Sequence, residues 1–244
     1  MERLRVVTWN VLHRVHGENW QELPIDAFPD ERERTRGVVR RVAEWLDGGV
    51  DAVCLQEASG DLSAALDEAL GARARRFAHV YPRVPKPRTP APAPLGDPRE
   101  LLLTFTARPA RQVESATFAT DPGKGLLAIE LGGVIRIVNT HVSSGPRRDD
   151  QLARVRGAAT AAGAAVVVGD FNAPADVVGA ALGVEFAVSD LRGQPPTRSA
   201  SRSLPGKCID HVAAFGGELA AATVIDVGGL SDHNAVLGDV DLGA

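Results

Sequence analysis

The sequence predicts an α/β protein. Short apolar runs alternate along the chain with segments of helical periodicity, an alternation typical of α/β folds. The runs are almost continuously apolar, which indicates strands buried on both faces. With 244 residues, the chain is long enough for one large domain or two small ones. No repeat and no shift in composition marks a boundary, so we expect a single domain over residues 1–244.

The predicted strands share one feature, a polar residue close behind the last apolar position. The four runs and their polar residues are 4–8 with Asn10, 52–55 with Glu57, 134–138 with His141, and 165–168 with Asp170. When strands are buried on both faces, polar side chains at their ends collect on one rim of the sheet. We therefore expect a functional site at this rim.

Three segments between these strands predict helices that cover the sheet faces. Residues 30–46 carry an apolar stripe, and Gly48 and Gly49 stop the helix. The stripe consists of Val38, Val39, Val42, Trp45 and Leu46. Residues 61–70 and 149–162 show further helical patterns. We expect the basic face of the first helix to be solvated. Its arginines are Arg32, Arg34, Arg36, Arg40 and Arg41.

Residues 82–98 predict a stiff, extended loop. Seven prolines forbid both a helix and the interior of a sheet here. They are Pro82, Pro85, Pro87, Pro90, Pro92, Pro94 and Pro98. The segment also carries Arg83, Lys86 and Arg88, cations suited to an anionic substrate group. Two interpretations stay open, a wall beside the functional site and a solvated spacer far from it.

Charge and composition limit the possible functions. The net charge is −4, so the chain lacks the overall positive field of proteins that bind duplex nucleic acid without specificity. Local arginine clusters can still line a groove. Beyond the first helix they are Arg73, Arg75 and Arg76, followed by Arg147 and Arg148.

The sequence also indicates where the protein works. It has no apolar run of membrane-spanning length and no secretory signal, so we expect a soluble, cytoplasmic monomer without a membrane partner. Cys54 and Cys208 lie in apolar, strand-like runs. We expect both to be buried free thiols, which fits a reducing compartment.

Six short motifs follow one another along the chain. They are Thr8-Trp9-Asn10, Leu55-Gln56-Glu57, Asn139-Thr140-His141, Gly169-Asp170-Phe171-Asn172, Ile209-Asp210-His211 and Ser231-Asp232-His233. Together, and in this order over residues 4–236, they resemble the motif series of the endonuclease/exonuclease/phosphatase superfamily. The resemblance implies a four-layered α/β/β/α sandwich, in which two mixed sheets pack face to face with helices outside. It also implies a metal site at one end of the sheets.

The chemistry of that superfamily needs these residue types. Cleavage of a phosphoester by water requires neutralised phosphoryl charge, an activated water and a stabilised leaving oxygen. Mg²⁺ prefers oxygen ligands and keeps several waters, so one or two carboxylates and an amide suffice. We predict Glu57, Asn10 and Asp232 as ligands of Mg²⁺, with Mn²⁺ as a substitute.

The remaining motif residues have catalytic roles by the same resemblance. A tight turn after Gly169 would let Asp170 and Asn172 point at one phosphate or water. Resemblance implies that these two orient the nucleophile and that His141 donates a hydrogen bond to a phosphoryl oxygen. His233 is the candidate general acid or base, with Asp210 fixing its tautomer, so we expect these two side chains within hydrogen-bond distance.

Other polar residues receive simpler interpretations. We assign Arg147 and Arg148, one of the candidate basic patches, to substrate binding. His211 should point to the strand face opposite Asp210 and be structural. We expect His13, His16 and His79 to be surface or loop residues rather than ligands.

The predicted function is Mg²⁺-dependent hydrolysis of phosphoester bonds by in-line attack of water. The substrate is a phosphorylated small molecule, a nucleotide or a nucleic acid, so phosphodiesterase, nuclease and phosphatase activities all stay open. Many relatives have a glycine-led turn where this chain has residues 98–103. Because of this difference, the substrate contacts that relatives make there cannot be assigned to this chain. The alternative is a catalytically inactive binding or scaffold module on the same fold, although such a module has no physical reason to keep uncompensated carboxylates together.

Overall fold

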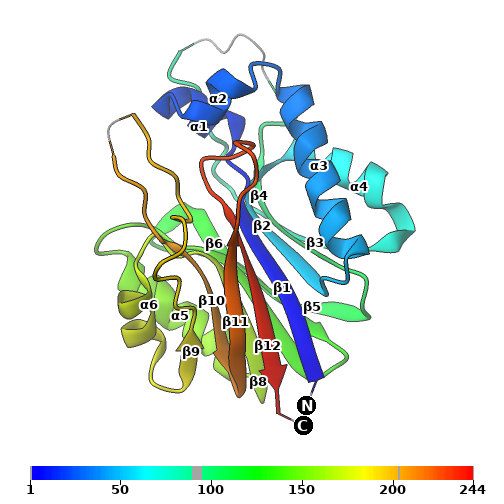
Figure 1. Ribbon diagram of the computed structural model, residues 1–244, viewed down its shortest axis with the longest axis vertical. Coiled ribbons are helices and arrows are strands. Elements are labelled where there is room, and N and C mark those ends of the chain that lie inside the picture. The colour runs from blue at the N-terminus through cyan, green and yellow to red at the C-terminus, as the bar shows by residue number, and fades with distance from the viewer. Residues whose placement is uncertain (1, 90–94, 203, 244) are drawn as a thin grey trace.

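The computed structural model describes residues 2–89, 95–202 and 204–243. Two six-stranded sheets pack face to face, and helices cover their outer faces (Figure 1). Each sheet contains one parallel pair among antiparallel pairs, so both are mixed. The four-layered α/β/β/α sandwich implied by the motif series is thereby confirmed.

The first sheet is built from both ends of the chain, in the order β11-β12-β1-β2-β4-β3. Its strands are β1 (Glu2–Asn10), β2 (Ala52–Ser59), β3 (Arg75–Val80), β4 (Glu100–Thr106), β11 (Gly217–Ile225) and β12 (Ala235–Leu242). β1 runs parallel to β2 and antiparallel to β12. Asn10, at the end of β1, is therefore aligned with Gln56 on β2, which brings Glu57 next to Asn10.

The second sheet uses the middle of the chain, in the order β5-β6-β7-β8-β10-β9. Its strands are β5 (Ala110–Phe118), β6 (Asp121–Leu131), β7 (Ile135–His141), β8 (Ala164–Asp170), β9 (Phe186–Val188) and β10 (Asp210–Phe215). The parallel pair β7 and β8 aligns His141 with Asp170, and the antiparallel pair β8 and β10 aligns Asp170 with Asp210. Three site candidates thus meet at one edge.

The helices include all three predicted from the sequence. They are α1 (Arg14–Trp20), α2 (Leu23–Ala27), α3 (Glu31–Asp47), α4 (Gly60–Leu70), the 3₁₀ turn η1 (Gly71–Arg73), α5 (Arg148–Thr160) and α6 (Ala175–Leu182). The Asp30 and Ser59 side chains cap α3 and α4 by accepting from backbone N–H groups. Figure 1 shows α1 and α2 at one end of the sandwich. Among the described helices, none is long and apolar enough to cross a membrane.

Three apolar cores explain why the strands read as continuous apolar runs. In β1, Leu4 and Val6 pack between the sheets, whereas Val7 and Trp9 pack towards α3. A third core joins the second sheet to α5 and α6, with Val155 and Val178 among its members. Because both faces of each central strand are covered, the side chains on both faces must be apolar. The burial of these faces supplies the main stabilisation of the fold.

A buried polar network crosses between the sheets directly behind the site. Asn139 on β7 donates through Nδ2 to the carbonyl oxygens of Leu55 (3.2 Å) and Leu103 (2.9 Å) in the opposite sheet. Gln56 donates to Asn139 Oδ1 at 2.7 Å and to Thr8 Oγ1 at 3.0 Å. Such a network has directional bonds that an apolar contact lacks, so it fixes how the two sheets align. Glu57 and His141 follow its members closely in sequence.

The described part of the proline-rich loop is irregular, as predicted; residues 90–94 of that segment lie outside the described residues. Two other expectations need correction. Arg34 does not lie on a solvated face, because its guanidinium is buried and donates to the carbonyl oxygens of Val11, Leu12 and Leu230. Cys208 lies outside the strands and is half-buried, whereas Cys54 is a buried free thiol in β2.

Candidate active site at the junction of the sheets

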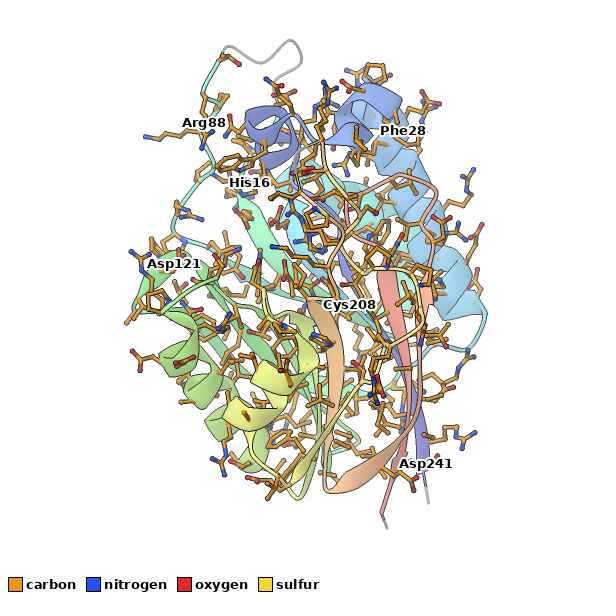
Figure 2. The ribbon with its side chains drawn as sticks, turned by 60° about the vertical axis from the view of Figure 1, so that its left-hand side comes forward. His16, Phe28, Arg88, Asp121, Cys208 and Asp241 are labelled. Carbon is orange, nitrogen blue, oxygen red and sulfur yellow. The ribbon has the colours of Figure 1, made fainter. Side chains whose placement is uncertain are left out.

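One pocket of about 720 Å³ lies where the strand ends of both sheets meet. Residues from both halves of the sandwich line it: Glu57, His141, Asp170, Asn172, Asp232 and His233 from the motifs, and His16, Trp20, Glu22, Arg83, Asp121, Lys124 and Arg147 from elsewhere. In Figure 2, His16 on α1 and Asp121 at the start of β6 belong to different layers of the fold. The pocket is therefore a junction between layers rather than a feature of one sheet.

Glu57 reaches the pocket because β2 carries a bulge. The register with β4 shifts between Leu55 and Ala58, and Glu57 has a left-handed backbone with φ of 56°. A bulge re-aims side chains that regular pleating would direct elsewhere. The carboxylate is then held from two sides, since Oε1 accepts from Asn10 Nδ2 at 3.2 Å and Oε2 accepts from the His13 N–H at 3.2 Å.

A tight turn after β8 positions Asp170 and Asn172, as predicted. Gly169 starts it with φ of 148°, and a Cβ there would lie 1.9 Å from the Thr140 carbonyl oxygen, so only glycine fits between the strands. Asp170 Oδ1 accepts from the Asn172 N–H at 2.9 Å, and Asn172 Nδ2 donates to the Val142 carbonyl oxygen at 2.9 Å. Asn10 Nδ2 bridges to Asp170 Oδ2 at 3.1 Å.

His141 and Lys124 lie beside these carboxylates. His141 Nε2 lies 3.3 Å from Asp170 Oδ2 and 3.8 Å from Glu57 Oε1, and Lys124 Nζ contacts the same imidazole. Burial alone would raise the pKa of the Asp170 carboxyl, but the hydrogen bond to His141 and its charge hold that pKa well below the ordinary value. Burial opposes ionisation of Glu57 too, yet the charges of His16 and His141 lower its pKa. Both groups are therefore carboxylates at neutral pH.

Asp210 and His233 form a buried pair on the other side of the pocket. Asp210 Oδ2 lies 2.9 Å from His233 Nδ1, which confirms the expected hydrogen bond. Burial would lower the pKa of His233, but the charges of Asp210 and Asp232 raise it to about 10. His233 Nε2 lies 3.9 Å from Asp232 Oδ2 and lines the pocket. The buried Asp210 carboxylate thus polarises the His233 imidazole and fixes its orientation.

Asp232 is held by an arginine that the sequence did not single out. Arg198 Nε donates to Asp232 Oδ2 at 3.2 Å, and its terminal nitrogen donates to Glu22 Oε1 at 2.8 Å. Arg198 also bridges through its backbone to His233. These contacts fix the loop that carries both Asp232 and His233.

Similarity to known proteins identifies the family of this chain. The sequence profile of the Endonuclease/Exonuclease/phosphatase family matches residues 7–233, nearly the whole chain. The chain belongs to this family. No curated protein sequence gave a significant match.

Solved structures share the fold of the endonuclease/exonuclease/phosphatase family over the full chain. A member from Beutenbergia cavernae has 21% identity and a TM-score of 0.70, over 100% of this chain and 72% of that one. A member from Bacteroides vulgatus has 18% identity and a TM-score of 0.70, over 100% of both chains. D. rerio TDP2, complexed with single strand DNA product, has 14% identity and a TM-score of 0.69, over 99% of this chain and 100% of that one.

The donor atoms of this family member fit a hard divalent cation. Carboxylate oxygens of Glu57, Asp170 and Asp232 face one pocket, and such oxygens are the ligands that Mg²⁺ prefers. Asn10 stands behind them: its Nδ2 bridges two carboxylates, and its Oδ1 accepts from the Leu12 N–H at 3.0 Å. The amide therefore keeps Glu57 and Asp170 together, whichever of them contacts the cation.

The two arginines assigned to substrate binding have different surroundings. Arg147 lines the pocket and lies 4.0 Å from Asp121. Arg148 does not line it; its guanidinium donates to the Asn172 carbonyl oxygen at 3.3 Å and supports the turn after β8. His211 is buried on the other strand face, with Nε2 2.9 Å from the Ala173 carbonyl oxygen, as a structural residue would be.

Several pocket residues escaped the sequence reasoning. His13 is a loop residue, as expected, although it is buried. The expectation is wrong for His79, which is buried in β3, and for His16, which lies on α1 and lines the pocket. Lys124 and Asp121 belong to an Asp-Pro-Gly-Lys stretch at the start of β6, directly before an apolar run, and this stretch is a detectable signal. Arg198 has no such signal, because only the folded chain brings it to Asp232.

Proposed function

We propose that this family member is a Mg²⁺-dependent phosphoester hydrolase, with Mn²⁺ as a substitute. One observation carries the proposal. The carboxylates of Glu57, Asp170 and Asp232 line the same pocket as the His233 imidazole, which the Asp210 carboxylate orients. The endonuclease/exonuclease/phosphatase family is named for phosphoester hydrolysis, and this arrangement offers what the reaction needs. A bound Mg²⁺ would neutralise phosphoryl charge, and Glu57, Asp232 and the Asn10 amide are the residues proposed to hold it.

The chain's own residues divide the remaining work. His141 and Lys124 would donate hydrogen bonds to phosphoryl oxygens, because both point into the pocket from β7 and β6. Asp170 and Asn172 would orient the attacking water from their shared turn. His233 would move a proton at Nε2 while Asp210 holds Nδ1. Each role follows from the atom that the side chain turns towards the pocket.

The pocket's rim favours a nucleotide or single-stranded substrate. Trp20 is 63% exposed at this rim, and the Arg88 guanidinium lies 4.1 Å from its ring centroid. An exposed indole is a surface on which a base can stack. D. rerio TDP2, a structural neighbour, is complexed with single strand DNA product. The acidic net charge argues against non-specific duplex binding.

The test is hydrolysis of nucleotides, single-stranded DNA and sugar phosphates by metal-stripped protein. We expect no turnover in excess chelator and recovery on addition of Mg²⁺ or Mn²⁺. Glu57→Gln keeps the side-chain size but removes a charge, and it should slow hydrolysis by about 100-fold or more, the upper end of what disturbed metal sites lose. Undiminished turnover in chelator would sink the proposal. A folded wild type that hydrolyses none of these substrates would favour the inactive scaffold module instead.

A further inference from the structure

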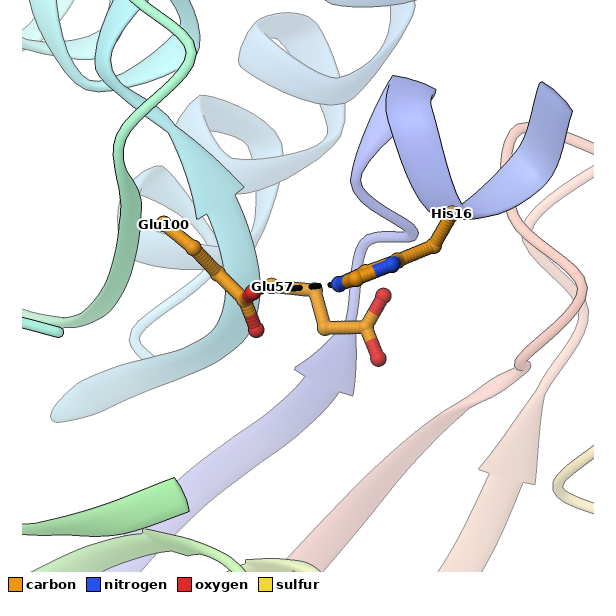
Figure 3. Close-up of side chains that lie close together, drawn as sticks. All are labelled: His16, Glu57 and Glu100. Carbon is orange, nitrogen blue, oxygen red and sulfur yellow. Dashed lines mark hydrogen bonds and ion pairs between the residues drawn. The ribbon is translucent and has the colours of Figure 1, made fainter. Parts of the chain in front are cut away.

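A second group of potential ligands lies beside Glu57, on the side away from Asp170. His16 from α1, Glu57 from β2 and Glu100 from β4 each offer one ligand atom, and these atoms all lie within 4.8 Å of one another. Figure 3 shows the two carboxylates on either side of the His16 ring. His16 Nε2 lies 3.0 Å from Glu100 Oε2. The three residues come from separate elements, so only the folded chain assembles them.

Glu100 supplies an independent indication that a cation belongs here. Its side chain has no solvent exposure, and its Oε1 makes no hydrogen bond in the described structure. A buried carboxylate oxygen without a donor is costly, and proteins usually avoid it. Glu57, a second carboxylate, adds to the negative charge of the same region. One divalent cation would satisfy the orphaned oxygen and balance both carboxylates.

We propose that His16, Glu57 and Glu100 form a transition-metal site, which shares Glu57 with the Mg²⁺ site proposed at Glu57, Asp232 and Asn10. An imidazole ligand suits Mn²⁺ or Zn²⁺ better than Mg²⁺, which prefers oxygen ligands and holds its waters. Metal–ligand bonds of about 2.0–2.2 Å require the three ligand atoms to draw together slightly from their present spacing. Neither His16 nor Glu100 belongs to the family's six motifs, and Glu100 lies in the stretch where this chain departs from many relatives.

Sharing Glu57 would couple this site to the proposed catalytic centre. Glu57 Oε1 faces Asn10 and His141, whereas Oε2 receives the His13 N–H. A carboxylate between two cation positions is common in two-metal sites. A metal held by His16 and Glu100 would therefore fix the rotamer of Glu57, and it would do so whichever phosphoester the protein cleaves.

Equilibrium binding of Mn²⁺ in excess Mg²⁺ tests the proposal without relying on activity. Mg²⁺ should fill oxygen-only sites, so the Mn²⁺ that stays bound, measured by electron paramagnetic resonance of free Mn²⁺, reports the imidazole site. We expect one Mg²⁺-resistant Mn²⁺ per wild-type chain. His16→Gln retains a hydrogen-bond donor for Glu100, and Glu100→Gln retains the shape. Each should weaken this binding by at least about 10-fold, as lost support at metal sites does.

His79→Gln is the matched control, because it replaces another buried histidine outside the group. It should leave Mn²⁺ binding unchanged. Thermal unfolding without metal identifies variants that fail to fold, and a folded Glu100→Asp then replaces a failed Glu100→Gln. The absence of Mg²⁺-resistant Mn²⁺ in wild type would overturn the proposal. The proposal would also be overturned if a folded variant of His16 or Glu100 bound as much Mg²⁺-resistant Mn²⁺ as wild type. His16 would then be only an ion-pair partner of Glu100.

Discussion

Backbone strain concentrates at the residues that line the pocket. Among the described non-glycine residues, four have a positive φ, and three of them line the pocket: Leu12, Glu57 and Asn172. Such conformations cost about 1–3 kcal/mol each and persist only when surrounding contacts enforce them. Asn10 stabilises two of these conformations, those of Leu12 and Glu57, because its Oδ1 accepts from the Leu12 N–H and its Nδ2 donates to Glu57. The strained backbone aims polar groups at one point.

The Asp210 and His233 pair predicts a particular pattern of kinetic defects. Because Asp210 Oδ2 holds His233 Nδ1 at 2.9 Å, the two act as one unit. Removal of a general acid or base costs about 10²–10⁴ in rate, so His233→Ala should lose this much. The double variant with Asp210→Ala should lose little more, since residues of one unit are non-additive. Steady-state kcat of wild type, both single variants and the double variant measures this; defects that multiply would assign the residues separate roles.

The positions of the carboxylates and imidazoles could be read from the sequence, but their supports could not. Glu57 and Asp170 stand out because each closely follows a continuous apolar run. Arg198 and Glu22 are distant in sequence from Asp232, and nothing local shows that they meet. His16 escaped for the same reason, since its partner Glu100 lies on another element. Pairs across the fold depend on tertiary packing rather than local pattern.

At the scale of elements, β8 depends on glycine at one position. A Cβ at Gly169 would overlap the Thr140 carbonyl oxygen of β7. Gly169→Ala should therefore destabilise the fold by about 2 kcal/mol or more, a strain of the size that steric backbone conflicts produce. It should also displace Asp170 and reduce activity. Urea unfolding measures the first effect and kcat the second.

Gly157→Ala is the matched control in a neighbouring element. Gly157 is an exposed interior residue of α5 with no heavy atom near its missing Cβ. Alanine there should stabilise the fold by about 0.5–1 kcal/mol, because it restricts the unfolded chain and favours the helix. If both alanine variants had the same stability, the close contact between β7 and β8 would not be the cause.

The proline-rich loop is docked against α1 where it is described. Arg88 N donates to Asn19 Oδ1 at 2.7 Å, Asn19 Nδ2 donates to the Lys86 carbonyl oxygen at 3.0 Å, and Arg83 lines the pocket. Replacing residues 84–96 by a short glycine-serine linker should change relative kcat/KM among substrates while metal dependence survives. Asn19→Ala, which removes two contacts to the loop, should shift selectivity in the same direction. Unaltered kcat/KM for every substrate would make the loop a spacer.

The central strands β1, β2, β7 and β8 and the long helices were predicted, whereas many other elements were not. β5 and β11 consist mostly of exposed and half-buried residues, and charged and small residues interrupt their apolar pattern. α1 and α2 are too short for helical periodicity to show. The four layers could be inferred only through the motif series, because apolar runs indicate buried strands but not how many sheets they form.

The two sheets of the whole molecule are joined at one edge through a histidine. His79 on β3 lies 2.7 Å from Ser115 Oγ and 2.9 Å from Thr117 Oγ1, both on β5 of the other sheet. Burial lowers the pKa of His79. The unfolded chain, with an ordinary value near 6.5, therefore binds more protons at acid pH than the folded chain does. This contribution to stability is complete above about pH 6.5 and is lost as pH falls through the folded pKa.

His79→Gln should therefore flatten the acid side of the stability profile. Glutamine can still reach the hydroxyl groups but does not titrate, so unfolding free energy should fall less between pH 7.5 and pH 5 than in wild type. At pH 7.5 the variant should be destabilised by about 1 kcal/mol, the usual net value of a hydrogen bond. Urea unfolding at both pH values measures the difference. If the pH dependence of stability were unchanged in the variant, folding would not alter the pKa of His79.

β12 is synthesised after the other strands of the described residues, yet it lies inside its sheet, between β11 and β1. The second sheet contains β5 to β10 in one stretch of chain and can pair early, because its strands follow one another in synthesis. β1 must wait with one edge unpaired until residues 235–242 emerge, and an unpaired strand edge invites association with other chains. Asp232 and His233 lie in the loop directly before β12, so one late segment of the chain completes both the pocket and the first sheet.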